Sequence, residues 1–389
     1  MRISRTVVAG LASAAIAASG LAGTALGNHQ TPQSADQADN SGVRLNQIQM
    51  MGSHNSYHRE LSPAEQKVQQ AQNPGSVDLW YSHASIPSQL EDQNIRTLEL
   101  DLLPDPDGGL YTYPLIRKLT GQGPLTDPAM AKPGIKIMHI PDFDYNTNCD
   151  TFVLCLQQVK SWSDKHPDHV PITINLELKQ SDPNVVAAGG VQSPPWDAAA
   201  LDGVDREIRS VFPEQTLLTA DDVRKPGLTL EQSVLTKGWP KLDAVRGQVL
   251  FYFDNGGPGA IRDLYLAGKP NLEGRAVFTR GPEGRPDAAI TQVNDPRGAN
   301  QAEIQRLVSK GYLIRTRSDE PLATIRDNDT SRVGIALASG AQVVTTDFPV
   351  VGMAARYDSD FVAKLPGNSA VRCNPVSAPQ WCRGTVAER

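Results

Sequence analysis

The sequence is poor in cysteine, in aromatic residues and in clustered basic charge, and each shortage excludes a class of protein. Aromatic residues make up 6% of the chain, and the formal net charge is −6 at pH 7. An acidic chain without a run of lysine or arginine does not favour binding to nucleic acid. A sugar-cleaving barrel is expected to have a groove rich in aromatic residues, and the low aromatic content gives no sign of one. The sequence also contains no internal repeat, no EF-hand pattern and no glycine-rich dinucleotide motif.

Long apolar runs are confined to the N-terminus. Arg2 and Arg5 precede an apolar stretch over residues 7–25, and small residues follow where a signal peptidase would cut. We therefore expect residues 1–27 to be a secretory signal peptide rather than a membrane anchor. We predict that residues 28–42 form a disordered leader, because they are rich in Gln, Asn, Asp and Ser. Residues 43–389 are expected to form a single secreted domain, since no later stretch reaches the roughly 20 apolar residues of a membrane span.

The four cysteines fall into two close pairs, Cys149 with Cys155 and Cys373 with Cys382. In an exported protein, an even number of cysteines in local pairs predicts two loop-closing disulfides. A zinc site is the alternative, but the spacings do not match a zinc motif and no histidine stands beside the cysteines. The second disulfide would close a C-terminal tail of the domain.

Short apolar runs typical of strands alternate with segments long enough for a helix. This alternation predicts a mostly parallel sheet. Eight strands fit a closed (β/α)₈ barrel of the TIM type, in an α/β single domain with some irregularity, and a doubly wound sheet is the alternative. Two longer connections, 180–200 and 283–300, interrupt the alternation. The eight predicted strands are residues 47–52, 97–102, 135–139, 172–178, 249–253, 276–279, 312–316 and 342–345.

Ionisable and amide side chains gather at or near the carboxyl ends of the first four predicted strands. In an α/β barrel, this end carries the active site. Because alternate residues of a strand face the same side, Glu99 and Asp101 point one way and the leucines around them point the other. We expect both carboxylates to face into the barrel. The remaining side chains at these strand ends are His54, Asn55, His139, Glu177 and Lys179.

Buried carboxylates without a positive partner are costly, so a cation is expected between them. Glu99, Asp101 and Glu177 with the amide of Asn55 form an all-oxygen ligand set, which suits a hard cation. Calcium is favoured over Mg²⁺ because it is abundant outside cells and tolerates irregular geometry. The alternative is an internal salt-bridge cluster in which Lys179 and arginines neutralise the carboxylates.

Two histidines at strand ends suit acid–base chemistry. His54 and His139 flank the carboxylates, and imidazole exchanges protons near neutral pH. Cleavage of a phosphodiester requires one group that removes a proton from the attacking hydroxyl and one that protonates the departing alkoxide. The other five histidines lie in polar or loop-like settings, so they are not assigned a role.

Later strands supply candidates for substrate binding. Arg315 and Arg317 share a strand face, and arginine suits phosphate oxygens. Lys179 is a further candidate for a phosphate contact, and Asp347 for sugar hydroxyls. The plainer interpretation is that these side chains form salt bridges or, for Asp347, cap a turn.

Taken together, these motifs resemble the phosphatidylinositol-specific phospholipase C family, in particular its secreted, calcium-dependent bacterial branch. The residues that carry the resemblance are His54-Asn55-Ser56-Tyr57, Glu99-Leu100-Asp101, His139, Glu177 and the segment 339–349. The resemblance implies that His54 and His139 are the acid–base pair and that Asn55, Glu99, Asp101 and Glu177 bind Ca²⁺. It also implies attack by the inositol 2-hydroxyl, giving diacylglycerol and a cyclic inositol phosphate. Which group removes the first proton stays open.

The implied partner is a phospholipid headgroup, met transiently at a membrane surface, with no obligate protein partner. Trp80, Tyr81 and Trp196 are candidates for a membrane-docking surface. A glycerophosphodiester phosphodiesterase is the nearest alternative, but there Arg-Gly usually follows the first histidine, where this chain has Asn55-Ser56. A non-catalytic secreted barrel is the second alternative. Such a protein would be expected to have lost some of these side chains, and all of them are present.

Overall fold

A ring of eight parallel strands forms the centre of the fold in the computed structural model, which describes residues 42–255 and 259–388. Their order around the ring begins at the sixth strand of the chain and ends at the seventh, and a bridge between Arg280 and Ile290 links these two ends. The barrel is therefore nearly closed, which confirms the predicted (β/α)₈ architecture. In ring order the strands are β6 (Val277–Phe278), β5 (Val249–Phe253), β4 (Ile172–Leu178), β2 (Thr97–Leu103), β1 (Ile48–Ser53), β9 (Val343–Thr346), β8 (Leu313–Arg317) and β7 (Ile290–Gln292).

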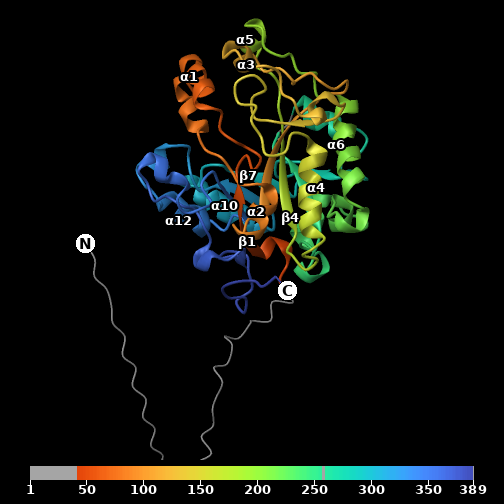
Figure 1. The fold of residues 1–389 in the computed structure, drawn as a ribbon. Helices are drawn as coiled ribbons and strands as arrows, with labels where there is room; N and C mark the ends of the chain where they lie inside the picture. The colour runs from red at the N-terminus through yellow and green to blue at the C-terminus, as the bar shows by residue number, and fades with distance from the viewer. Residues whose placement is uncertain (1–41, 256–258, 389) are drawn as a thin grey trace, which may run out of the picture. The chain divides into compact units, whose positions relative to one another are not determined.

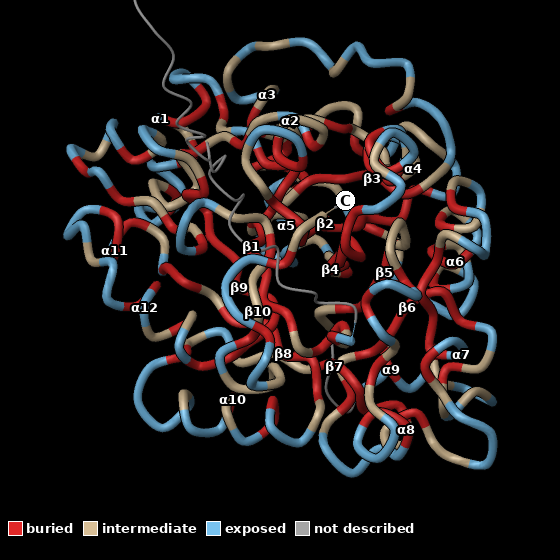
Figure 2. Tube along the Cα trace, turned by 90° about the horizontal axis from the view of Figure 1, so that it is seen from below, coloured by how far each residue is buried: buried red, intermediate tan, exposed pale blue. Residues whose placement is uncertain are grey.

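Helices surround the barrel and continue beyond one of its ends. Figure 2 shows the buried strands in the middle, with helices outside them whose outer faces are exposed. In Figure 1, α1, α3 and α5 stand above the barrel, while α4 and α6 run along its side. The helices are α1 (Pro63–Gln72), α2 (Ile86–Glu91), α3 (Leu115–Leu119), α4 (Phe152–Ser163), α5 (Pro183–Ala187), α6 (Ala198–Val211), α7 (Ala220–Val223), α8 (Leu230–Thr236), α9 (Ala260–Tyr265), α10 (Ala299–Lys310), α11 (Ala323–Arg326) and α12 (Ser331–Ala338).

Two strand predictions were wrong. The predicted strand 135–139 contributes only β3 (Lys136–Ile137), which pairs antiparallel with β2 and lies outside the ring. The eighth barrel strand is instead β7, inside the segment 283–300 that was predicted to be a long connection. A three-residue strand containing Thr and Gln carries too little apolar pattern to be recognised. His139 therefore lies in a loop after β3 and not at the end of a barrel strand.

The inner and outer faces of the barrel strands differ in chemistry. On β2, Leu98, Leu100 and Leu102 belong to the main apolar core between the barrel and the helices. The alternating Glu99 and Asp101 are fully buried on the inner face, as predicted. The side chains inside the barrel at the level of Glu99 and Asp101 are polar. The barrel is therefore stabilised mainly by the apolar core that lies outside the ring, against the helices.

Gly52 allows β1 to approach its neighbours closely just before the turn that carries His54. A Cβ atom at this position would lie 2.8 Å from Cβ of Thr97 and 3.0 Å from Cγ2 of Thr345. These contacts are too short for any side chain, so glycine is required here. The spacing of β1, β2 and β9 at the candidate site therefore depends on this residue.

Both predicted disulfides are present, Cys149–Cys155 and Cys373–Cys382. The second closes the C-terminal segment, which includes β10 (Val371–Cys373), paired antiparallel with β1. The predicted signal peptide, and all of the predicted leader except Gly42, lie outside the described residues. Within the described part of the chain, no helix has both the length and the apolar character needed to cross a membrane.

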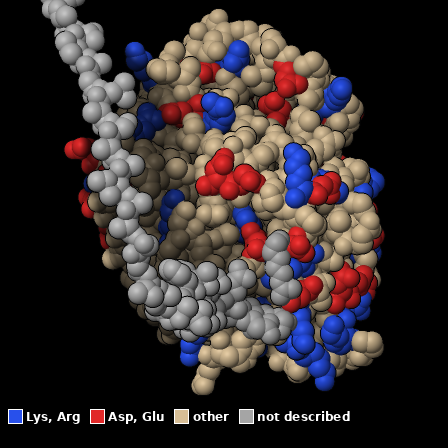
Figure 3. Space-filling model, turned by 60° about the horizontal axis from the view of Figure 1, so that its bottom comes forward, with Lys and Arg blue, Asp and Glu red and all other residues tan. Residues whose placement is uncertain are grey.

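Charges on the surface are mixed in sign. On the face shown in Figure 3, lysine and arginine side chains are interspersed with aspartate and glutamate. Exposed ion pairs such as Arg306 with Glu283, at 2.8 Å, illustrate this pairing. Water and salt screen such exposed pairs, so these contacts bear on solubility more than on stability.

Candidate active site

His54 lies directly after β1, where the chain leaves the barrel. Its backbone N–H donates to the carbonyl of Thr346 on β9 at 2.9 Å. Its Nδ1 lies 2.7 Å from one oxygen of Asp347, and the other oxygen of Asp347 accepts a hydrogen bond from Arg317 at 2.9 Å. Burial, together with the charge of Arg317, lowers the pKa of His54 to about 3, so the ring is neutral at pH 7. Asp347 thus holds Nδ1–H and leaves Nε2 to accept a proton.

Three carboxylates from consecutive strands converge beside His54. Glu99 of β2, Glu177 of β4 and Asp254, directly after β5, offer oxygens that all lie within 4.8 Å of one another. One oxygen of Glu99 is also 4.0 Å from Nε2 of His54, and its other oxygen accepts from Arg315 at 2.7 Å. Oxygen donors grouped in this way suit a hard divalent cation.

Two more predicted ligands have buried oxygens. Oδ1 of Asn55 lacks a hydrogen-bond partner among the described residues, and the carboxylate of Asp101 lies beside the Lys179 ammonium. Asn55 adopts a φ of +47°, and the next residue, Ser56, donates its N–H to the carbonyl of Glu99 at 3.0 Å. The Lys179 ammonium lies 3.3 Å from Asp101 and 3.2 Å from Glu177. Part of the predicted salt-bridge alternative is therefore present beside the carboxylate group.

The buried charges at this end of the barrel favour a positive partner. Burial raises the pKa of Glu99 to about 7 despite the opposing charge of Arg315, and it raises the pKa of Asp101 well above its usual value. A divalent cation would stabilise the ionised form of both groups. The unpartnered amide oxygen of Asn55 is the kind of neutral ligand that completes a calcium site. These residues thus fit Ca²⁺, and the ligand roles of Asn55, Glu99, Asp101 and Glu177 remain predictions.

His139 reaches the same end of the barrel from the loop after β3. Its Nδ1 lies 2.8 Å from an oxygen of Asp144, so the two predicted catalytic histidines each face a buried carboxylate through Nδ1. His139 and Lys179 line one groove, and Lys179 in turn contacts Asp101 and Glu177. Although its strand was wrongly predicted, His139 therefore lines the same groove as Lys179, the neighbour of two of the predicted carboxylate ligands.

Asp144 is shared with a second, fully buried histidine. Nε2 of His58 lies 2.9 Å from Asp144, and Nδ1 of His58 lies 3.1 Å from the carbonyl oxygen of Tyr81. Because both ring nitrogens face acceptors, both carry a proton and His58 is positively charged. Burial opposes this charge, but Asp144 outweighs it and raises the pKa of His58. The two histidines likewise outweigh burial at Asp144 and lower its pKa to about 2.

Tyr81 lies between the two histidine–carboxylate pairs. Its ring centre is 4.6 Å from that of His58, and the His58 ring centre is 6.3 Å from that of His139. On the other side, burial and then the Asp347 carboxylate raise the pKa of the Tyr81 hydroxyl well above its usual value. A continuous set of packed side chains therefore connects the surroundings of His139 to those of His54.

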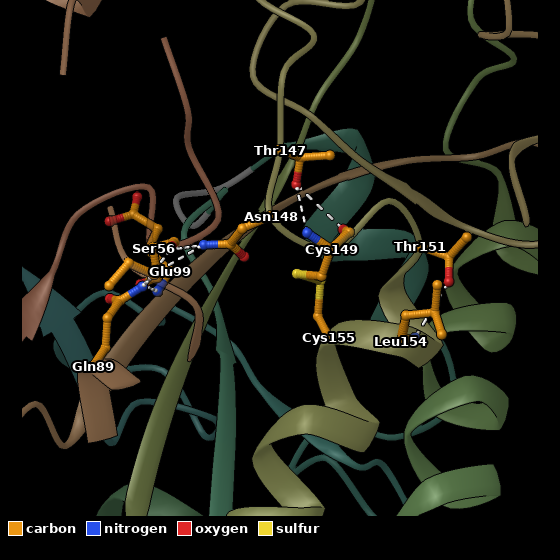
Figure 4. The surroundings of a disulfide bond; sticks show 10 residues. Ser56, Gln89, Glu99, Thr147, Asn148, Cys149, Thr151, Leu154 and Cys155 are labelled. Atoms are coloured by element: carbon orange, nitrogen blue, oxygen red, sulfur yellow. Dashed lines mark hydrogen bonds between the residues drawn. A yellow bond between two sulfur atoms is a disulfide. The ribbon is translucent and has the colours of Figure 1, made fainter. Parts of the chain in front are cut away.

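The disulfide Cys149–Cys155 ties the loop that follows His139 to α4. Asn148, next to the disulfide, donates to the carbonyl oxygen of Ser56 at 3.3 Å, and Gln89 donates to the same oxygen at 2.7 Å (Figure 4). The Ser56 hydroxyl accepts from the backbone N–H of Glu99 at 2.8 Å. The loop, the Asn55 turn and the Glu99 strand are thus tied together at Ser56.

The predicted substrate-binding residues are all engaged in ion pairs, with Asp347 held by His54 and Arg317. Arg315 bonds to Glu99, Arg317 to Asp347, and Lys179 lies between two acidic groups. Their substrate roles remain predictions. Two of the membrane-docking candidates are wrong, because Tyr81 is 5% exposed and Trp196 is 3% exposed.

Sequence reasoning missed Asp254, Asp144 and His58. Asp254 carries the same signal that marked Glu177, a carboxylate at the end of a correctly predicted strand. His58 follows the His54-Asn55 motif by a few residues, yet nothing in its local pattern distinguishes a buried charged histidine from a surface one. Asp144 lies in a loop, where only the fold brings it between two imidazoles.

Comparison with known proteins identifies the family of this chain. Two structures of a calcium-dependent phosphoinositol-specific phospholipase C from a Gram-negative bacterium, Pseudomonas sp., have a similar fold. An apo form shares 18% identity with a TM-score of 0.52, covering 87% of this chain and 97% of that one. A myo-inositol complex shares 18% identity with a TM-score of 0.51, covering 87% and 100%.

No curated protein matches the chain. The family described as "Phosphoinositide phospholipase C, Ca2+-dependent" matches residues 43–375. This range contains the barrel strands, His54, His139 and the carboxylate group. The chain therefore belongs to the Ca²⁺-dependent phosphoinositide phospholipase C family.

Proposed function

We propose that this calcium-dependent phospholipase cleaves phosphatidylinositol with His54 as the general base and His139 as the general acid. The observation that carries the proposal is the matched arrangement of the two imidazoles. Each has Nδ1 on a buried carboxylate, Asp347 or Asp144, which leaves Nε2 for proton transfer. The histidine beside the carboxylate group is assigned to the attacking hydroxyl, because Nε2 of His54 lies 4.0 Å from Glu99.

In this reaction the inositol 2-hydroxyl attacks phosphorus, and its proton passes to Nε2 of His54. The bond from phosphorus to the glycerol oxygen breaks, and Nε2–H of His139 protonates that oxygen. The products are diacylglycerol and a cyclic inositol phosphate, which water can then open if the two histidines exchange roles. Acid–base help from one positioned side chain contributes roughly 10²–10⁴-fold.

Glu99, Glu177 and Asp254 are the proposed carboxylate ligands of Ca²⁺, with Asn55 and Asp101 as further ligands. A bound Ca²⁺ would acidify the attacking hydroxyl and offset the negative charge that develops on the phosphate. Arg317 supports the same site by holding Asp347 against His54, at 2.9 Å from the carboxylate. The proposed role of Lys179 is to offset the negative charge of Asp101 and Glu177 and to bind the phosphate of the substrate.

The substrate is proposed to lie in a membrane that the enzyme meets transiently, outside the cell. Export is supported by two disulfides, which persist in oxidising compartments. The proposed inositol site is supported by the Pseudomonas phospholipase whose structure contains myo-inositol.

Chelation of calcium provides the test of this function. Phosphatidylinositol vesicles are incubated with the enzyme, with and without a calcium chelator, and the products are identified by phosphorus NMR. We expect a cyclic inositol phosphate signal with Ca²⁺, and a loss of at least about 100-fold in rate with the chelator that added Ca²⁺ restores. A wild-type enzyme that cleaves glycerophosphoinositol but not phosphatidylinositol would overturn the substrate assignment. Full activity in the chelator would overturn the metal assignment.

A further inference from the structure

A groove of about 810 Å³ opens beside the candidate active site. Its inner part includes His139 and Lys179, and its walls come from α1, the helical turn Pro74–Leu79, α3, the loop after His139 and α5. Of these elements, α1, α3 and α5 can be seen above the barrel in Figure 1. The volume lies within the range of sites that hold a small ligand.

The walls of the groove are apolar or neutral along most of their length. Apart from His139, the charged side chains that line it are Lys179, which faces Asp101 and Glu177, and Asp182, which caps α5 by accepting from the N–H of Asn184 at 2.7 Å. Both charged groups therefore already have partners. Besides Pro141, Pro183 and Ala188, six larger apolar side chains line the groove: Leu79, Leu115, Leu119, Ile140, Phe143 and Val185.

Of these six apolar side chains, only Phe143 packs against a buried core, the smaller one around Leu61 and Leu103. All six are partly or fully exposed, and Leu119 at the end of α3 is 52% exposed. When a ligand removes exposed apolar side chains of one groove from water, the free energy falls, and this stabilises the complex. Neutral polar side chains such as Gln72, Asn73 and Gln180 also line the groove, so an uncharged ligand with long apolar parts matches this lining better than an anionic or cationic one.

We propose that this groove holds the diacylglycerol part of the lipid, with the glycerol oxygen at His139 and the acyl chains along α3 and α5. The proposal rests on the proposed function, in which the headgroup reacts at the carboxylates and the departing glyceride takes its proton from His139. The proposed position of the glyceride follows from His139, which belongs both to the proton-transfer site and to the wall of the groove. The groove thus makes the enzyme specific for an acylated substrate.

Substitution of Leu119 tests this inference with two substrates that share one phosphodiester. Dihexanoyl-phosphatidylinositol, kept monomeric in solution, carries acyl chains, and glycerophosphoinositol does not. For Leu119→Asp, we expect the ratio of kcat/KM for the acylated substrate over the other to fall at least about tenfold, since even one methylene in an apolar pocket is worth 10–200-fold. The matched control is Leu264→Ser on α9, where Leu264 is 40% exposed, and its ratio should equal that of the wild type.

The alternative outcomes separate the groove from the active site and from the membrane. An unchanged ratio for Leu119→Asp would overturn the inference. So would a loss seen only on vesicles and not on the monomeric lipid, because the surface would then dock membranes without holding the glyceride. Binding of dihexanoylglycerol, measured by calorimetry, tests the groove without catalysis. It should weaken at least about tenfold in Leu119→Asp even if the wild type proves inert on phosphatidylinositol.

Discussion

Replacement of His139 by alanine is expected to lower kcat for phosphatidylinositol by roughly 10²–10⁴-fold, because the departing glycerol oxygen then leaves without a proton. KM should change much less, since the headgroup contacts are proposed to lie on the barrel strands. Steady-state kinetics at saturating Ca²⁺ measures the effect. His166→Ala is the matched control, because His166 lies on the surface, where it contacts Glu91 at 3.1 Å, and it should keep the wild-type rate.

A substrate with a better leaving group separates the acid from the base. Inositol p-nitrophenyl phosphate releases nitrophenolate, which needs little protonation, so His139→Ala should recover most of its lost rate on this substrate. His54→Ala should remain impaired on both substrates, because the attacking hydroxyl must lose its proton in each case. Equal losses for the two variants on both substrates would contradict the assignment of roles. Wild-type kcat in His139→Ala would contradict a catalytic role altogether.

Replacement of Asp254 by asparagine is expected to raise the calcium concentration needed for half-maximal activity by at least about 100-fold. The loss of a residue that only supports a metal ligand already costs about 10–100-fold in metal affinity, and Asp254 is proposed to be a ligand itself. One carboxylate oxygen of Asp254 lies within 4.8 Å of oxygens of Glu99 and Glu177. Without Asp254, the two remaining carboxylates would bind Ca²⁺ more weakly.

Calcium titrations of activity and of calorimetric binding measure this effect. Asp263→Asn provides the matched control, since Asp263 is an exposed carboxylate on α9 that lies 3.6 Å from Arg262. If Asp254→Asn requires no more calcium than the wild type, the cation is held elsewhere, and Asp101 with Asn55 would be the first residues to substitute.

The sequence predicted the parts of this molecule that depend on local pattern. Glu99 and Asp101 alternate with leucines, so their inward direction follows from the geometry of a strand. The cysteine pairs lie close in the chain, so their pairing follows from spacing. The family resemblance rested on His54, His139 and the carboxylates, and the family match over residues 43–375 agrees with it.

Features that depend on contacts distant in the chain could not be predicted. The strand β7 is short and polar, and it exists because β8 pairs with it on one side. The charge on His58 depends on Asp144, 86 residues away. The groove forms because α1, α3 and α5 meet above the barrel. The residue pattern of these short helices does not predict that arrangement. Asp254 is different, because its position after a predicted strand was a usable signal.

A crystal structure of the enzyme with Ca²⁺ and myo-inositol would examine the whole proposal in one experiment. The account predicts one calcium ion bound by carboxylate oxygens of Glu99, Glu177 and Asp254, with an inositol hydroxyl within hydrogen-bond distance of Nε2 of His54. An ion bound away from these three residues, or inositol out of reach of both His54 and His139, would contradict it.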